Sequence, residues 1–319
     1  ITYMDATQGW IPTTDDDVAA PAVSPNQNPY GIFAYGGTGS GSRFSMSNLV
    51  SDTGVVGTDV TGVGEDRGQL GACEYGGDKG IFAYGYDNVQ AYVSMSNLVS
   101  NAGVVATDVT GVGTARSGVV AATYGGDKGI FFGGAWDDGS TTYYLNTPNL
   151  VSNAGVIATD VSGTGTGRSE LAACEYGGDK DKCIFGYGFN GGVLSMSNLV
   201  SNAGVVATDV TGVGTARRQP SACGYGGDKG IFGYGSVVSM TNLVTNAGVV
   251  GTDVTGVGTS RAGTGACEYG YDKGIFAYGT ANWSAYLSMS NLVSNVGVVG
   301  TDVTGVGTDR SQPGACSYG

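Results

Sequence analysis

The chain has 319 residues, 60 of them Gly, a net charge of −13 and no His. Hydrophobic residues make up 41% of it, which excludes a disordered chain, while charged residues make up only 13%. Without His, Ser-His-Asp and Cys-His catalysis and most zinc sites are excluded. No apolar run reaches the roughly 18 residues of a transmembrane helix, so membrane insertion is not expected.

Basic residues are too few and too regularly spaced to form a nucleic-acid-binding surface. Of the 14 Lys and Arg residues, all but Arg43, Lys182 and Arg218 recur at equivalent positions of an internal repeat. Nucleic-acid binding would require a basic patch or stripe, which this distribution does not supply. We therefore expect no nucleic-acid partner, and the negative charge favours solubility.

Residues 1–27 lie outside the repeat and form the first predicted element. Pro12, Pro21 and Pro25, together with the acidic run at residues 15–17, are typical of an extended polar connector. We expect this segment to be dispensable for the fold and to attach the rest of the chain to other subunits. The start at Ile1, without a Met, suggests a processed or truncated N-terminus.

Residues 28–319 consist of six tandem repeats. An Arg marks each repeat, at intervals of 49, 52, 49, 44 and 49 residues. A period of this length is the signature of a repeat architecture and decides the fold. The marker residues are Arg67, Arg116, Arg168, Arg217, Arg261 and Arg310.

Each repeat contains four short β-compatible segments, here called a, b, c and d. In the second repeat they centre on Cys73, Phe82, Met95 and Asp108, and turn residues separate them. No segment carries the apolar stripe of a helix. A parallel β-helix would have shorter coils, and a leucine-rich repeat would have a regular Leu ladder. The sequence therefore predicts an all-β, six-bladed β-propeller with four antiparallel strands in each blade.

The two ends of the repeat array complement each other. The first repeat starts at its segment b, residues 31–36, and the chain stops after a segment a, residues 314–318. The strand missing at one end is the surplus strand at the other. The sequence therefore predicts a ring closed by the C-terminal strand, which completes blade one, whereas an open array would need polar caps.

The order of residues in each repeat resembles the kelch family. An Arg is followed by a small-residue strand, a Gly-Gly-Asp-Lys turn and an aromatic strand ending in Gly, most fully at residues 127–134. The resemblance covers residues 28–319 and implies the blade topology without a function. The double Gly after segment b survives only at residues 36–37 and 133–134, and the Trp expected after segment c is absent.

Two further stretches resemble structural and tail-fibre proteins of bacteriophages. They are YMDATQGWIPT near the start and the near-identical SMSNLVSNAGVVATDVTGVG repeats. This resemblance implies a virion structural protein, located on the virion or another extracellular surface, that binds other appendage subunits through its N-terminal segment.

The cysteines of segment a are predicted to be structural. A strand at the crowded centre of a ring favours small apolar side chains, and free Cys behaves as one. Cys183 begins segment b of the fourth repeat, and a disulfide with Cys174 across the hairpin stays open. The equivalent segment-a residues are Cys73, Ala122, Cys174, Cys223, Cys267 and Cys316.

The repeated Arg and the repeated Asp of segment d have two interpretations. Pairing with each other or with the backbone would serve the repeat itself, because a buried Arg needs acceptors. A ring of these Asp could alternatively bind calcium, and no other cofactor is expected. The Asp residues are Asp59, Asp108, Asp160, Asp209, Asp253 and Asp302.

The connections between segments b and c, the b–c loops, vary most between repeats. They contain every Trp except Trp10, and in a four-stranded meander they emerge on one face with the d–a links. Such aromatic and polar side chains are typical of a recognition surface, although they could instead cover the blade edges beneath them. The candidate ligand-binding residues are Tyr86, Tyr92, Trp136, Asp137, Asp138, Tyr143, Asn282, Trp283 and Tyr286.

These patterns predict a non-enzymatic structural and binding protein that recognises a glycan or a protein on a host surface. A glycan-processing enzyme is the first rival, but it needs paired carboxylates. Glu74, Glu175 and Glu268 are instead repeat-equivalent, and the sialidase signature Ser-x-Asp-x-Gly-x-x-Trp is absent. A kelch-type adaptor, the second rival, would usually bring a partner domain, more basic residues and His.

Overall fold

The computed structural model describes residues 2–5, 9–11, 28–39 and 41–319, and it confirms the all-β class. Within the predicted connector, β1 (Thr2–Asp5) and β2 (Gly9–Ile11) form a two-stranded antiparallel sheet, and the rest of residues 1–27 lies outside the described residues. In the described ranges the single helical element is a 3₁₀ turn at Gly178–Lys180. No helix there is long and apolar enough to span a membrane.

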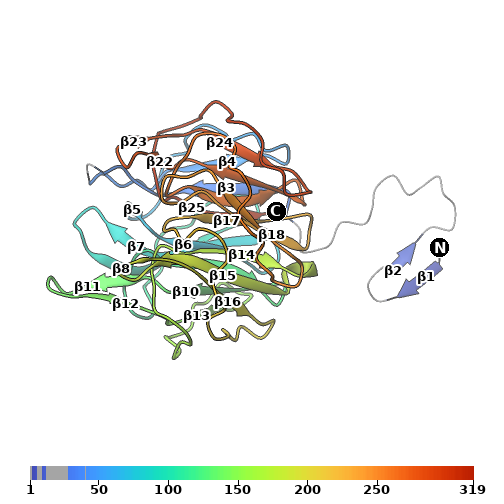
Figure 1. The fold of residues 1–319 in the computed structure, drawn as a ribbon, viewed down its shortest axis with the longest axis horizontal. Coiled ribbons are helices and arrows are strands. Elements are labelled where there is room, and N and C mark those ends of the chain that lie inside the picture. The colour runs from blue at the N-terminus through green and yellow to red at the C-terminus, as the bar shows by residue number, and fades with distance from the viewer. Residues whose placement is uncertain (1, 6–8, 12–27, 40) are drawn as a thin grey trace.

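Six antiparallel sheets carry the fold, and in each one segment b lies between segments a and c (Figure 1). Segment a forms β6 (Gly71–Tyr75), β9 (Val120–Tyr124), β14 (Ala172–Tyr176), β17 (Ser221–Tyr225), β20 (Gly265–Tyr269) and β25 (Gly314–Tyr318). Segment b forms β3 (Tyr30–Ala34), β7 (Lys79–Asp87), β10 (Lys128–Phe132), β15 (Lys182–Phe189), β18 (Lys229–Gly233) and β21 (Lys273–Ala277). Segment c forms β4 (Ser47–Val50), β8 (Tyr92–Val99), β13 (Asn149–Val151), β16 (Val193–Val200), β19 (Thr241–Val244) and β24 (Ser290–Val293).

Short strands lie at the ends of segment b. β5 (Arg67–Gly68) pairs with β7 and belongs to its sheet. In the third and sixth repeats the b–c loops form separate two-stranded sheets: β11 (Ala135–Asp137) with β12 (Thr142–Tyr144), and β22 (Thr280–Ala281) with β23 (Ala285–Tyr286). In the second and fourth repeats the b–c ladder itself continues into the loop, through β7–β8 and β15–β16.

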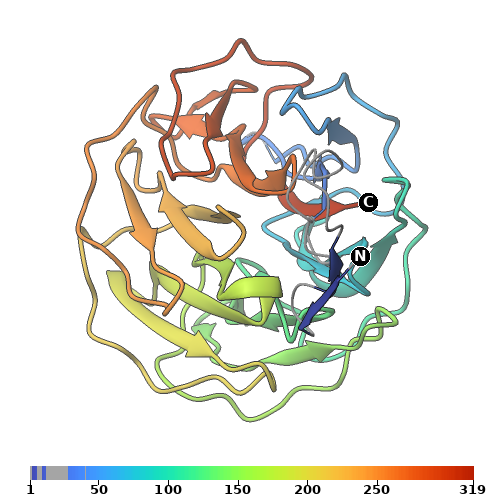
Figure 2. The same ribbon diagram turned by 90° about the vertical axis from the view of Figure 1, so that its right-hand side faces the viewer.

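The six sheets stand in a circle, with segment a of each sheet nearest the centre (Figure 2). Each inner strand packs on the next, in the order β6, β9, β14, β17, β20, β25 and back to β6. The C-terminal β25 pairs with β3 and places Cys316 opposite Ile32, which confirms the predicted pairing between the two ends of the array. The chain thus closes on itself through backbone hydrogen bonds.

Segment d is not a regular strand, which corrects the prediction of four strands in each blade. In most repeats it is joined to segment c by two isolated bridges. Between those bridges a buried Asn reaches across; Asn97, for example, donates to the Ala106 carbonyl at 2.9 Å. The side-chain amide uses an acceptor that a continuous ladder would need. In the third repeat Pro148 also removes a backbone donor.

The segment-a cysteines pack between neighbouring sheets. A Cβ added at Gly129 would lie 2.5 Å from Cys73 Sγ, so Gly is required opposite this thiol. Between the third and fourth sheets the arrangement is reversed, since Ala122 replaces the Cys and Cys183 replaces the Gly in one apolar cluster. The same approach as at Gly129 recurs in the pairs Cys174–Gly230, Cys223–Gly274, Cys267–Gly31 and Cys316–Gly80.

Cys183 therefore fills a packing position and forms no disulfide. In the hairpin it stands opposite Glu175, while Cys174 stands opposite Ile184, and all six cysteines are free and buried. Burial raises the pKa of the Cys183 thiol well above its usual range. A thiol of this kind is inert because the thiolate is the reactive form.

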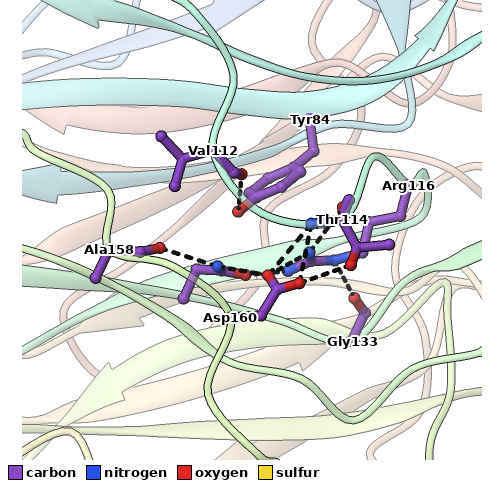
Figure 3. A network of polar contacts seen from close by, with 8 residues as sticks. Tyr84, Val112, Thr114, Arg116, Gly133, Ala158 and Asp160 are labelled. Atoms are coloured by element: carbon purple, nitrogen blue, oxygen red, sulfur yellow. Dashed lines mark hydrogen bonds and ion pairs between the residues drawn. The ribbon is translucent and has the colours of Figure 1, made fainter.

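The repeated Arg side chains join neighbouring sheets, as Figure 3 shows for Arg116. This fully buried guanidinium donates to the Gly133 carbonyl at 2.8 Å and to Asn149 Oδ1 at 2.6 Å. Asp160 Oδ1 lies 3.8 Å from it, and Asp160 Oδ2 accepts from Thr114 of the preceding repeat at 2.6 Å. These groups are the expected structural pairing of Arg and Asp.

The same network connects the last repeat to the first. Arg310 donates to Asn48 Oδ1 at 2.7 Å, and Thr308 donates to Asp59 Oδ2 at 2.6 Å. Because the segment-d carboxylates accept hydrogen bonds within the chain, the alternative of a calcium ring gains no support. In the ranges that the structure describes, no cluster of three or more His, Cys, Asp or Glu residues could hold a metal ion.

Candidate functional site

The six inner strands, one from each sheet, surround a central channel. Its two ends differ in the segments that surround them. Because segments a, b and c run antiparallel, the a–b turns lie at one end and the b–c loops lie at the other with the d–a links. Figure 1 shows the loop hairpins β11–β12 and β22–β23 together at one edge of the molecule. All nine candidate residues belong to b–c loops or to the strand ends beside them.

The candidates of the third repeat form a single hairpin. Trp136 stacks on Tyr143 across the β11–β12 pair, with ring centroids 4.4 Å apart. Asp138 accepts hydrogen bonds from the backbone of Ser140 and Thr141 and from Tyr143 Oη, which lowers the pKa of Asp138 to about 2. Asp138 thus supports the loop, and Asp137 does the same through the Gly139 N–H and the Thr142 hydroxyl.

The candidates of the sixth repeat lie in a loop that leans on the first repeat. Asn282 accepts from the Ser284 hydroxyl at 2.9 Å and holds the turn. Trp283 is 44% exposed, and the Arg218 guanidinium carbon lies 4.9 Å from its ring centroid. A Cβ at Gly39 would collide with Tyr286 Oη, so the first-repeat loop passes directly over that hydroxyl.

Tyr86 and Tyr92 form a third, separate group. They stand opposite each other in the β7–β8 ladder, with ring centroids 4.9 Å apart. Arg43 from the first repeat covers the Tyr86 ring at 4.7 Å. Burial raises the pKa of Tyr92. This pair fits the alternative in which aromatic side chains cover the edge of a sheet.

Residues that the sequence analysis did not single out form the mouth of the channel. Shortly before each segment a, one residue has a positive φ, between 53° and 65°. Backbone hydrogen bonds join these residues from one repeat to the next. Two of these positions are Gly, which adopts this conformation without strain, and four are Gln or Glu. The mouth residues are Gln69, Gly118, Glu170, Gln219, Gly263 and Gln312.

Two cavities meet at these mouth residues. The first, of about 120 Å³, continues the channel inward past a ring of segment-a alanines. The second, of about 220 Å³, lies between the first-repeat and sixth-repeat loops and is lined by Arg43, Trp283 and Tyr286. Gln69, Gln219 and Gln312 line both cavities. The alternation of Gln, Gly and Glu at one position of a nearly invariant repeat is the signal that would have found them.

The opposite end of the channel is closed by Lys180. The fourth repeat has two extra residues in its a–b turn, and the 3₁₀ turn they form directs Lys180 inward, where it is 4% exposed. Its ammonium contacts Glu74 Oε2 at 2.5 Å and Glu268 Oε2 at 2.9 Å. The sequence analysis counted Lys180 among the lysines at equivalent repeat positions and Lys182 as an exception. In the structure Lys182 occupies that position, because it pairs with Tyr176 as Lys79 pairs with Tyr75.

Two carboxylates contact the Lys180 ammonium, and a third, Glu175, interacts with it electrostatically while accepting a hydrogen bond from Thr123 N–H at 2.8 Å. Burial raises the pKa of Glu74 to about 7, although Lys180 opposes the shift, and burial also raises the pKa of Glu175. Glu74 further accepts from Asn28 Nδ2 at 2.9 Å. Of the three acids that the sequence assigned to blade structure, Glu74 and Glu268 therefore form an ionic cluster with Lys180.

No protein-family model matches this sequence, and a comparison with curated proteins finds no relative. The kelch and phage resemblances therefore remain expectations from the sequence. We therefore base the functional proposal on the geometry of the channel end that the b–c loops surround.

Proposed function

We propose that residues 28–319 form a six-bladed β-propeller of the kelch-like kind, which acts as a non-enzymatic recognition module. The cyclic packing of the inner strands, the β25–β3 pairing and the Arg–Asn–Asp network that recurs between repeats support this architecture. Radial repetition of small sheets leaves only short edges exposed. The loops are then free to vary on a fixed disc, as they do here.

The opposite placement of the chain entry and the aromatic loops carries the functional proposal. The Pro29 carbonyl accepts from Gly270 N–H in an a–b turn at 2.9 Å, and Asn28 contacts Glu74 at the closed end of the channel. The connector thus leaves from the face opposite Trp136 and Trp283. A module attached by one face presents the other, so we place the ligand on the b–c loop face.

We propose a glycan on a host surface as the ligand, and a phage virion or a comparable extracellular appendage as the location. Other appendage subunits would bind through residues 1–27. Exposed Trp and Tyr beside polar side chains suit sugar rings, which have apolar C–H faces and a rim of hydroxyls. An enzyme is disfavoured because Asp137 and Asp138 accept hydrogen bonds inside their own loop and Glu74 is bound to Lys180.

The test is attachment of the purified chain to a glycan array and to a panel of bacterial cells. Replacing Trp136 or Trp283 by Ala should weaken attachment by roughly 1–3 kcal/mol, as expected for an interface anchor. The fold should survive, since both side chains lie outside the three regular strands of their sheets. If both variants unfold more easily while attachment of the folded molecules is unchanged, these aromatics only cover sheet edges. Attachment to cells without any glycan on the array would indicate a protein ligand instead.

A further inference from the structure

The mouth residues keep polar side chains at backbone positions that disfavour them. Gln69, Glu170, Gln219 and Gln312 all have φ between 53° and 60°, a left-handed conformation that strains every residue with a Cβ. Gly118 and Gly263 show that Gly fits the same place in the ring. The scaffold alone therefore does not require the Gln and Glu side chains, and strain retained in this way is concentrated at ligand-binding sites.

Hydrogen-bonding capacity at the mouth is only partly used within the chain. Gln219 Nε2 donates to Glu170 Oε1 at 3.0 Å. Glu170 Oε2 is buried and accepts no hydrogen bond from the part of the chain that the structure describes, and Arg218 Nε lies 3.8 Å from it. Amide groups both donate and accept, while a carboxylate accepts. This combination matches hydroxyl groups, each of which also donates and accepts.

An aromatic surface adjoins this polar ring. Trp283 and Tyr286 line the cavity that contains Gln69, Gln219 and Gln312. Arg218 connects the two parts, because its guanidinium lies over Trp283 and pairs with Glu170. A polar rim beside an aromatic wall is complementary to a sugar ring, with its hydroxyl edge and its C–H face.

The size of the cavities and the closed channel limit what can enter. Volumes of about 220 and 120 Å³ are smaller than the ~300–1,000 Å³ of pockets for drug-sized ligands. Beyond the mouth lies the alanine ring, and the far end is filled by Lys180 and its carboxylates. A glycan chain cannot thread through the disc, so only its end can occupy the mouth.

We propose that the mouth of the channel binds the terminal sugar of a glycan chain end-on. Gln69, Gln219, Gln312 and Glu170 hydrogen-bond its hydroxyls, and Trp283 and Tyr286 contact its apolar face. This inference rests on the proposed function and names its ligand: a neutral, hydroxyl-rich terminal sugar ring. The rest of the glycan extends outward between the b–c loops.

The experiment uses the full chain and defined sugars. Ligand-observed NMR first measures binding of five monosaccharides: glucose, galactose, mannose, rhamnose and N-acetylglucosamine. It then measures binding of oligosaccharides that end in the sugar that binds. The same oligosaccharides are measured again after an exoglycosidase has removed that terminal sugar. Removal should abolish binding. Gln312→Gly and Glu170→Gln should each weaken binding about tenfold, the loss of one or two hydrogen bonds.

Gln90→Gly is the matched control, because Gln90 also has a positive φ of 64° but lines neither cavity. It should change sugar binding less than twofold. One result would overturn the inference while leaving the proposed function intact: glycan binding that depends on Trp136 and is unaffected by Gln312→Gly. Cell attachment that depends on Trp283 with no sugar bound at all would overturn both the inference and the glycan ligand, and would indicate a protein ligand on the same face. If every Trp variant keeps both sugar binding and cell attachment, the inference and the proposed function are both overturned.

Discussion

Polar side chains lie at both ends of the axial channel, but their hydrogen-bonding groups are satisfied to different degrees. At the closed end, Lys180 and the carboxylates of Glu74 and Glu268 bind one another at 2.5 and 2.9 Å. At the open end, Gln312 adopts a strained conformation, and Glu170 Oε2 accepts no hydrogen bond from any residue that the structure describes. Buried polar groups that satisfy each other hold a structure together, whereas strained groups with spare capacity are available to a ligand.

The largest effect should follow from opening the ring. Deleting residues 312–319 removes β25, which pairs with β3 and packs on β6 and β20. Because native domains are stable by only about 5–15 kcal/mol, losing an inner strand should prevent cooperative folding. Circular dichroism during heating would show a broad, low-temperature transition. A truncated chain that melts like the parent would show that β25 is not needed to close the ring of sheets.

The next effect concerns the closed end. Lys180→Met leaves the buried carboxylates of Glu74 and Glu268 without their cation and should cost about 3–5 kcal/mol of unfolding free energy, as breaking a buried ion pair does. Lys182→Met is the matched control, since that lysine in the same turn is 45% exposed at its side chain. It should cost less than about 0.5 kcal/mol. Denaturant unfolding measures both.

A rescue separates the charge effect from packing. Adding Glu74→Gln and Glu268→Gln to Lys180→Met removes these two uncompensated charges and should recover much of the lost stability. If Lys180→Met costs no more than Lys182→Met, the closed end is not held by its ionic cluster. The contrast between the two ends would then disappear.

The closed end should also respond to pH. The pKa of Glu74 is about 7 in the folded protein, above the ordinary value of 4.5, because burial disfavours its charged form. The folded state therefore binds the proton more tightly, so this group's stabilisation is present below pH 4.5 and is lost as pH rises through 7. Unfolding free energy should fall between pH 5 and 7, and Glu74→Gln should flatten that decline. An unchanged slope in the variant would show that Glu74 does not titrate in this range.

The sequence predicted the scaffold better than the site. Repeated segments predicted the all-β class and the pairing of residues 314–318 with segment b at residues 31–36, because near-identical repeats are expected to form the same strands and contacts in each copy. Segment d was wrong in detail, since a buried Asn such as Asn97 interrupts its ladder. The loop aromatics fell into three separate groups, because loop conformation depends on contacts such as Tyr286 with Gly39 that no periodicity encodes.

The smallest expected change in stability concerns the open end. Gln312→Gly relieves a left-handed conformation that costs about 1–2 kcal/mol. The greater conformational entropy of Gly in the unfolded state offsets part of this stabilisation. The unfolding free energy should therefore rise by up to about 1 kcal/mol. Chemical denaturation of this variant beside Gln90→Gly would measure it. A clear loss of stability would show that the Gln312 side chain serves the scaffold.

The most direct test of the account measures unfolding free energy and surface attachment together for Lys180→Met and Gln312→Gly. We expect each variant to change only one of the two quantities. Lys180→Met should have a much lower unfolding free energy, yet its folded molecules should attach like the parent. Gln312→Gly is at least as stable as the parent but attaches about tenfold more weakly, a change of about 1.4 kcal/mol. If Gln312→Gly attaches as well as the parent, or if attachment in both variants follows stability alone, the open end of the channel is not the recognition site.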